Sequence, residues 1–294
     1  MSCTNDHLTS IRHSYPDLRV KSARSLDHGQ NNDILILNDE LIFRFPRYPN
    51  MLASLSKEIA VLRHIAGRTD LQVPNPEYAN TEIAGPHKAF VGYRMIPGAP
   101  LWPESLARFG DKTLERVASQ LTGFLSQLHD DGLSKVELPI ADTNDELSNL
   151  YLRIREKLFP CVSQGTRDRI RSHFESHLSR GDFLDSKPAL RHGDFGPSNI
   201  LFDETTATVT GIIDFGNSGL GDPAYDFAGL LSGYGDSFLN RCFAIFPEAR
   251  DYAERIHFYR GIFALMEALF GIENGDQEAF RNGMKGIGIS PIPQ

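Results

Sequence analysis

Two neighbouring stretches carry most of the information in this chain: R-H-G-D-F-G-P-S-N-I-L-F, Arg191 to Phe202, and G-I-I-D-F-G, Gly211 to Gly216. They place Asp194, Asn199 and Asp214 close together in a strand–loop–strand unit. One carboxylate can accept the proton of an attacking hydroxyl, while the other carboxylate and the amide hold Mg²⁺ against a nucleotide's phosphates. Each residue alone is equally typical of a turn or a cap, but the ordered combination favours phosphoryl transfer.

Composition and charge limit the remaining possibilities. The chain has 294 residues, of which 40% are hydrophobic and 23% charged, as in a globular protein with one large or two ordinary domains. No apolar run is long enough for a membrane span, and the N-terminus lacks the features of a secretory signal. The three cysteines are odd in number and far apart, which favours reduced thiols and a cytoplasmic location.

The net charge of −8 argues against nucleic acid as a partner, because no basic stripe is present. From Arg191 to the C-terminus there are 14 acidic and 7 basic residues. This imbalance suits a small cationic substrate, although it equally suits a surface that is merely well solvated. Nothing in the sequence indicates an obligatory protein partner.

The order of elements predicts an α+β fold with a strand-rich N-terminal lobe and a larger helical C-terminal lobe. Strands are expected at 22–26, 33–37, 40–45 and 90–96, with a helix at about 52–66 between the third and the fourth. Helices are expected at 114–129, 147–158 and 167–178, and again after Pro223, with a long one at about 249–271. We therefore divide the chain into a nucleotide-binding lobe, 1–96, a hinge, 97–100, and a helical lobe, 101–294, with the active site in the cleft between the lobes.

The nucleotide is expected to contact the N-terminal lobe. A loop with a single glycine, which includes Gln30 and Asn31, is a weak candidate for covering the phosphates. Period-2 alternation places Arg44 on the strand face opposite Phe43 and Phe45, where it can bind phosphate oxygens. Glu58 lies on the apolar stripe of the following helix and needs a partner, for which Arg44 is the best candidate.

The motifs resemble those of the aminoglycoside phosphotransferase family, small-molecule kinases that share the protein-kinase fold. The resemblance extends from about Arg19 to Ile287, includes G-D-P-A-Y-D-F-A at Gly221 to Ala228, and is strongest to the aminoglycoside 2''-phosphotransferases. It implies that Asp194 is the catalytic base, that Asn199 and Asp214 bind Mg²⁺, and that Arg44 and Glu58 form the phosphate-binding pair. It also implies that Tyr93 is the gatekeeper of the base pocket, beside base contacts from Arg94 and Met95. A bulky gatekeeper accompanies a preference for GTP over ATP in this family.

Three departures from the family pattern concern substrates. Arg44 stands where a lysine is usual, and Asn217 stands where relatives that modify aminoglycosides often have an acid. The C-terminal helices offer Phe263 but no tryptophan to pack on a sugar. Candidate contacts to amines are Asp236, Glu267 and Glu273, each of which equally suits a solvated helix face.

The leading interpretation is an antibiotic-resistance kinase that transfers the γ-phosphate of GTP or ATP to a hydroxyl of an aminoglycoside-like substrate. One alternative is a kinase of another hydroxylated metabolite or of a macrolide, which Asn217 favours. A second is a regulatory nucleotide-binding module of low activity, which Arg44 favours.

Overall fold

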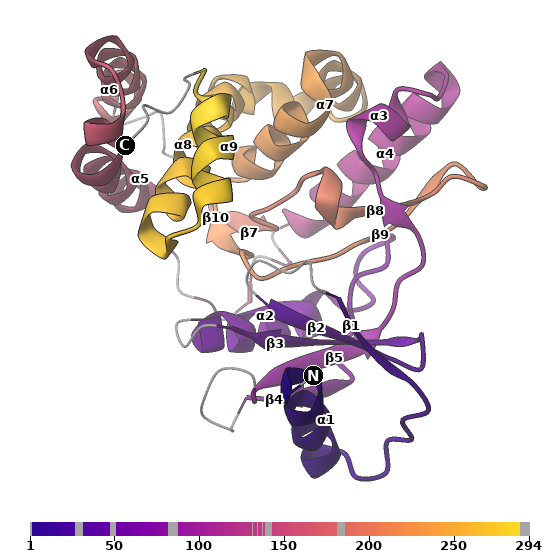
Figure 1. The fold of residues 1–294 in the computed structure, drawn as a ribbon. Coiled ribbons are helices and arrows are strands. Elements are labelled where there is room, and N and C mark those ends of the chain that lie inside the picture. The colour runs from indigo at the N-terminus through magenta and orange to yellow at the C-terminus, as the bar shows by residue number, and fades with distance from the viewer. Residues whose placement is uncertain are drawn as a thin grey trace. The chain divides into compact units, whose positions relative to one another are not determined.

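The computed structural model describes residues 2–26, 32–47, 51–81, 88–130, 132, 133, 135, 136, 138, 143–180 and 186–288. The chain divides into two compact units, the first comprising Met1–Leu138 and His192–Gly219 and the second Pro139–Arg191 and Leu220–Gln294. Figure 1 shows the elements of both units. Within the described residues, no helix combines the length and the apolar character that crossing a membrane requires.

The first unit contains a five-stranded antiparallel sheet in the order β1-β2-β3-β5-β4. Its strands are β1 (Ala23–Leu26), β2 (Asn32–Leu37), β3 (Leu41–Pro46), β4 (Tyr78–Asn80) and β5 (Phe90–Arg94). Helices α1 (Ser2–Ser14) and α2 (Met51–Ile65) lie on opposite faces of this sheet (Figure 1). The sequence predicted α2 and four of the strands, but it missed α1 and β4.

Alternation along β3 and β5 builds a separate apolar layer on each face of the sheet. Phe43 and Phe45 are fully buried with Ile11 of α1, whereas Val91 and Tyr93 are buried against Leu55 and Ile59 of α2. Burying apolar area on both faces is the main force that fixes the two helices to the sheet. Because side chains alternate along a strand, Arg44 lies on the α2 side of β3, as its spacing from the two phenylalanines predicted.

The rest of the first unit holds the motif residues. Strand β6 (Ala99–Pro100) pairs with β8 (Ile200–Asp203), which pairs with β9 (Thr208–Ile212). Residues 99 and 100 of the expected hinge therefore form β6, which pairs with β8 in a three-stranded sheet. Helices α3 (Pro103–Leu106) and α4 (Asp111–Leu128) follow β6, and a short 3₁₀ turn, η3 (Pro197–Asn199), precedes β8.

The described part of the second unit is mostly helical, with β7 (Ala189–Arg191) paired to β10 (Gly219–Gly221), whose first residue belongs to the first unit. Its α-helices are α5 (Thr143–Arg153), α6 (Gln164–Leu178), α7 (Ala224–Ile245), α8 (Ala253–Asn274) and α9 (Gln277–Gly286). Short turns lie between them: η1 (Ile154–Leu158), η2 (Phe159–Cys161) and η4 (Pro247–Tyr252). The helix expected at 147–158 thus ends as α-helix at Arg153 and continues as the π-helical turn η1.

Buried polar contacts join the helices of this unit. Asp222 accepts hydrogen bonds from the Arg255 Nε, at 2.8 Å, and from the Tyr259 hydroxyl, at 3.1 Å. It also accepts from the backbone N–H of Ala224 in the first turn of α7. Asp222 therefore joins the start of α7 to α8, and its place in the G-D-P-A-Y-D-F-A motif is structural.

Candidate active site

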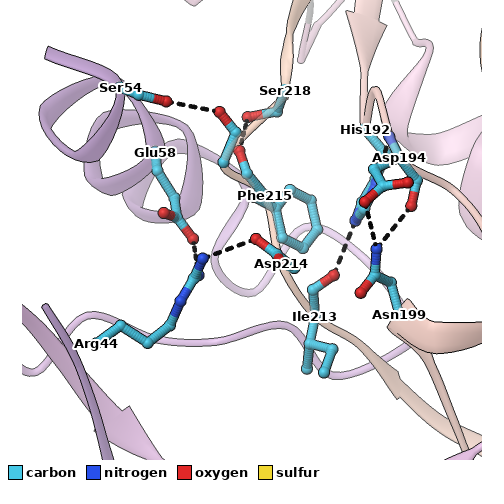
Figure 2. Close-up of polar contacts among 11 residues, drawn as sticks. Arg44, Ser54, Glu58, His192, Asp194, Asn199, Ile213, Asp214, Phe215 and Ser218 are labelled. Atoms are coloured by element: carbon cyan, nitrogen blue, oxygen red, sulfur yellow. Dashed lines mark hydrogen bonds and ion pairs between the residues drawn. The ribbon is translucent and has the colours of Figure 1, made fainter. Parts of the chain in front are cut away.

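The loop between β7 and β8 places Asp194 beside Asn199. The Asn199 Nδ2 donates to the backbone oxygen of Asp194, at 2.9 Å, and to its carboxylate Oδ2, at 3.0 Å (Figure 2). Gly193 enters this loop with a φ of 79°, and a Cβ there would lie 2.3 Å from the Asn217 carbonyl oxygen. Only glycine fits such a close approach, so the loop geometry explains the G in the H-G-D motif.

His192 connects this loop to the residue that precedes the second aspartate. Its ring is buried, and its Nδ1 accepts from the Asp194 backbone N–H at 3.2 Å. The Nε2 lies 3.0 Å from the Ile213 carbonyl oxygen. Because a carbonyl can only accept, both contacts are satisfied by the neutral tautomer with its proton on Nε2. His192 is thus a structural member of the site, a role that the sequence analysis did not assign.

Asp214 has an unusual backbone conformation. Its φ of 64° lies in the left-handed region, which costs a residue other than glycine about 1–3 kcal/mol and must be held by its surroundings. Its side chain is 47% exposed, and its Oδ1 accepts from the Arg44 Nη2 at 2.8 Å. Burial alone would raise the pKa of this carboxyl, but the positive charge of Arg44 holds the pKa below its usual value.

Arg44 and Glu58 form a buried ion pair. The Arg44 Nη1 lies 2.5 Å from the Glu58 Oε1, so the guanidinium joins α2 to Asp214 through its two terminal nitrogens. Burial would lower the pKa of Arg44, but the two carboxylates raise it well above its usual value. Burial raises the pKa of Glu58, and Arg44 opposes that shift. A lysine has one nitrogen, so it would not reproduce this planar bridge.

These side chains line one cavity of about 840 Å³ in the first unit, a size that suits a nucleotide and part of an acceptor. Asp194, Asn199, Asp214, Arg44 and Glu58 all contribute to its wall. The other lining residues are Asn32, Ile34, Met51, Ser54, Leu55, Pro100, Trp102, Ser198, Gly216 and Asn217. The cavity wall therefore brings Arg44 and Glu58 together with Asp194, Asn199 and Asp214, which are far from them in the sequence.

The oxygen atoms of this cavity suit a hard divalent cation. Since Asn199 uses its Nδ2 toward Asp194, its Oδ1 is the atom it can offer, beside the carboxylate of Asp214. The described residues contain no cluster of three or more His, Cys, Asp or Glu side chains that could enclose a metal. Two oxygen ligands fit Mg²⁺, which keeps several waters and usually binds substrate phosphates as well.

Of the residues expected around the nucleotide base, Tyr93 is buried and Arg94 is exposed. Tyr93 is buried on β5 beside Arg44, and burial raises its pKa to about 12. Arg94 is exposed, with ion pairs to Glu77 and Glu40, and Met95 donates its backbone N–H to the Glu40 carbonyl at 2.8 Å. Any base contact by Met95 would therefore use its carbonyl or its side chain. Gln30 and Asn31 lie outside the described residues.

The expected acceptor-binding residues are divided between the two units. Asn217 lines the cavity, whereas Asp236, Phe263 and Glu267 belong to the second unit. Asp236 is exposed next to a kink of α7 at Gly235, and Phe263 packs edge-on against Tyr225. Glu267 is exposed on α8, and partial burial raises its pKa.

Glu273, a further expected amine contact, already has partners. Arg153 donates to both of its carboxylate oxygens, and the Lys157 Nζ lies 2.9 Å from Oε1. Hydrogen bonds from Arg153, only partly opposed by burial, lower its pKa to about 2. Its negative charge is therefore already compensated within the second unit.

Ser54 and Trp102 are among the lining residues that were not singled out from the sequence as functional. Ser54 donates its hydroxyl hydrogen to the Gly216 carbonyl oxygen at 2.8 Å. Trp102, the only tryptophan of the chain, is 50% exposed at the start of α3 and lines the cavity. Glu58 is four residues after Ser54 in α2, and this helical spacing could have indicated a shared face. No feature of the sequence pointed to Trp102.

Comparison with known proteins identifies the family. The sequence matches the phosphotransferase enzyme family over residues 22–264, so the chain belongs to that family. Viomycin phosphotransferase of Streptomyces vinaceus is 33% identical over 271 residues, which cover 89% of this chain and 91% of that protein.

Solved structures agree with this assignment. The GDP and kanamycin complex of the aminoglycoside phosphotransferase APH(2'')-IIIa superposes with a TM-score of 0.87 at 26% identity, covering 96% of this chain and 97% of that one. The macrolide 2'-phosphotransferase MphH from Brachybacterium faecium has the same fold, with a TM-score of 0.72 at 16% identity and coverage of 98% and 99%. The expected α+β fold of the aminoglycoside phosphotransferase type is confirmed, and the protein is a phosphotransferase that acts on a hydroxyl acceptor.

Proposed function

We propose that this protein transfers the γ-phosphate of GTP or ATP to a hydroxyl group of an antibiotic and so confers resistance. The observation that carries the proposal is the joint placement of Asp194, Asn199 and Asp214, with Arg44, in the wall of one cavity. The candidate acceptors are an aminoglycoside of the kanamycin kind, in the 2'' type of transfer, and viomycin. Both are named with the similar proteins described above.

Asp194 is proposed to act as the base. Its Oδ2 accepts from Asn199, which orients the carboxylate that would take the proton of the acceptor hydroxyl. The acceptor oxygen then forms a bond to the γ-phosphorus as the bond between that phosphorus and its bridging oxygen breaks, with GDP or ADP as the leaving group. Positioning and charge stabilisation supply most of the rate in such transfers.

Asn199 and Asp214 would hold Mg²⁺, which neutralises charge on the phosphates when it is bound. Arg44 has five N–H donors, so its contacts with Glu58 and Asp214 leave others for a phosphate oxygen. Glu58 would fix the guanidinium by its buried contact. Gln30 and Asn31 stay candidates for covering the phosphates.

The donor is proposed to be GTP in preference to ATP. Two observations support this choice: the similar APH(2'')-IIIa was solved with GDP, and Tyr93 is a bulky, buried side chain on β5. Tyr93 would act as the gatekeeper beside base contacts from Arg94 and Met95, with residues 97–100 as the hinge between the proposed lobes. Because GTP and ATP are cytoplasmic metabolites, we place the activity in the cytoplasm.

The acceptor would be cationic and would contact Asn217, Asp236, Phe263 and Glu267. Asn217 lines the cavity with a neutral side chain. This observation favours a second candidate function, a kinase of a macrolide or of another hydroxylated metabolite, because a polycation would be better matched by an acid.

Steady-state phosphotransfer with Mg²⁺ tests the proposal. GTP and ATP would be compared against kanamycin, gentamicin, viomycin and a macrolide. Turnover that depends on an aminoglycoside or on viomycin, with kcat/KM above about 10⁴ M⁻¹s⁻¹, supports the proposal. Turnover with the macrolide alone would support the second candidate. Nucleotide binding without transfer to any acceptor would instead favour a regulatory module.

A further inference from the structure

Two side chains of α2, Ser54 and Glu58, link the helix to the loop of Asp214. Ser54 and Glu58 are four residues apart, so they share one face of α2. Glu58 reaches the Asp214 carboxylate indirectly, through Arg44, whereas Ser54 donates directly to the Gly216 carbonyl at 2.8 Å. Figure 2 shows both contacts with the same loop.

The loop at 213–216 is held by a side chain at each of its residues. The acceptors are the Ile213 carbonyl, the Asp214 Oδ1, the Phe215 carbonyl and the Gly216 carbonyl, and the donors are His192, Arg44, Ser218 and Ser54 respectively. Ser218 lies 3 residues after Phe215 and His192 precedes Ile213 by 21 residues, whereas Arg44 and Ser54 come from β3 and α2, 170 and 162 positions from Asp214 and Gly216. The left-handed conformation of Asp214 depends on such surrounding contacts.

Gly216 lies close to the charged groups of the site. A Cβ on Gly216 would be 3.4 Å from the Asp214 Oδ1 and 3.9 Å from the Glu58 Oε2. A rotation of the peptide after Gly216 would therefore shift backbone dipoles next to the carboxylate that is proposed to hold Mg²⁺. The hydrogen bond from Ser54 opposes that rotation.

We propose that Ser54 is a positioning residue, which fixes the Gly216 carbonyl and thereby sets the direction of the Asp214 carboxylate toward the metal–nucleotide complex. The inference rests on the proposed function of the site. Ser54 touches neither of the reacting groups and acts through Gly216. Since Ser54 and Gly216 both line the cavity, water can replace the lost hydroxyl, so the fold tolerates the loss better than the chemistry does.

Three variants test this inference. Ser54→Ala removes the hydrogen bond, and Ser54→Thr keeps a hydroxyl at the same Cβ. Ser56→Ala is the matched control, because Ser56 is exposed on the same helix and donates to the Leu52 carbonyl of its own helix at 3.5 Å. Binding of Mn²⁺, in place of Mg²⁺, is measured by electron paramagnetic resonance in the presence of GDP, together with kcat, KM and Tm.

We expect Ser54→Ala to weaken Mn²⁺ binding and to lower kcat by about tenfold each, the size expected for one lost hydrogen bond to the loop. The KM for the acceptor and the Tm, within about 3 °C, should stay close to those of wild type. Ser54→Thr should recover most of the loss, and Ser56→Ala should behave as wild type.

Equal Mn²⁺ binding and equal kcat in Ser54→Ala and Ser56→Ala would overturn the inference. A lower kcat with a large fall in Tm and unchanged Mn²⁺ binding would also overturn it, because that pattern indicates a structural role. If wild type transfers phosphate to no acceptor, the proposed function fails. The Mn²⁺ titration with GDP would still test Ser54 in that case.

Discussion

Removing Arg44 tests the buried ion pair at the centre of the site. Arg44→Ala leaves Glu58, which is 4% exposed, without its partner at 2.5 Å. An uncompensated buried charge destabilises a fold by about 3–5 kcal/mol. Asp214 loses a partner as well, but its side chain is 47% exposed and contributes little to that figure. We expect Tm to fall by about 6–20 °C at pH 8.

The loss of stability in Arg44→Ala should become larger as the pH rises. Burial raises the pKa of Glu58, and in the variant Arg44 no longer opposes that shift. A group whose pKa is higher in the folded than in the unfolded state contributes stability below its unfolded pKa and loses it as the pH rises through the folded value. The variant should therefore approach wild type near pH 4.5, the ordinary value for a glutamate, and fall furthest behind it at pH 8.

Calorimetry of wild type, Arg44→Ala and the double variant Arg44→Ala with Glu58→Leu, at several pH values, measures this effect. The double variant removes both charges and places an apolar side chain beside Leu55 and Ile59, so it should recover most of the stability. A deficit in Arg44→Ala that is the same at pH 5 and pH 8 would refute the reasoning, as would a double variant no more stable than the single one.

Three further predictions concern catalysis and binding. Asp194→Asn should lower kcat by about 10²–10⁴-fold while GDP binding, measured by calorimetry, stays as in wild type; unchanged turnover would show that Asp194 is not the base. Tyr93→Ala should raise kcat/KM for ATP relative to GTP, and an unchanged ratio would count against Tyr93 as the gatekeeper. Because Trp102 is the only tryptophan, is half exposed and lines the cavity, GDP or kanamycin binding should shift its fluorescence, and no response to either ligand at saturation would place both away from it.

Asp194, Asn199 and Asp214 could be predicted as site residues from the sequence, because they follow one another at short, characteristic spacings along the chain. The spacing of Asp194, Asn199 and Asp214 brings them together through one strand–loop–strand unit, so little long-range information is needed. Alternation in β3 likewise places Arg44 opposite Phe43 and Phe45, since the side-chain period of a strand is fixed. Helix α1 was missed because it has few apolar residues. Two of them, Leu8 and Ile11, pack on the sheet, and this contact is seen only in the folded structure.

The sequence by itself determined the α+β class, the order of the elements that it predicted and the charged residues of the candidate site, whereas α1 and β4 came only from the structure. The pairing of Arg44 with Glu58 was already expected from the sequence, but only the tertiary structure decided that Arg44 also reaches Asp214, that Ser54 reaches Gly216, and that Glu273 is held by Arg153 and Lys157. Residue types and their short-range spacing can be taken directly from the sequence, because the periods of helices and strands are fixed by local geometry. Partners such as Arg44 and Asp214, which are 170 positions apart, depend on how helices and strands pack, and packing depends on the whole set of buried side chains at once.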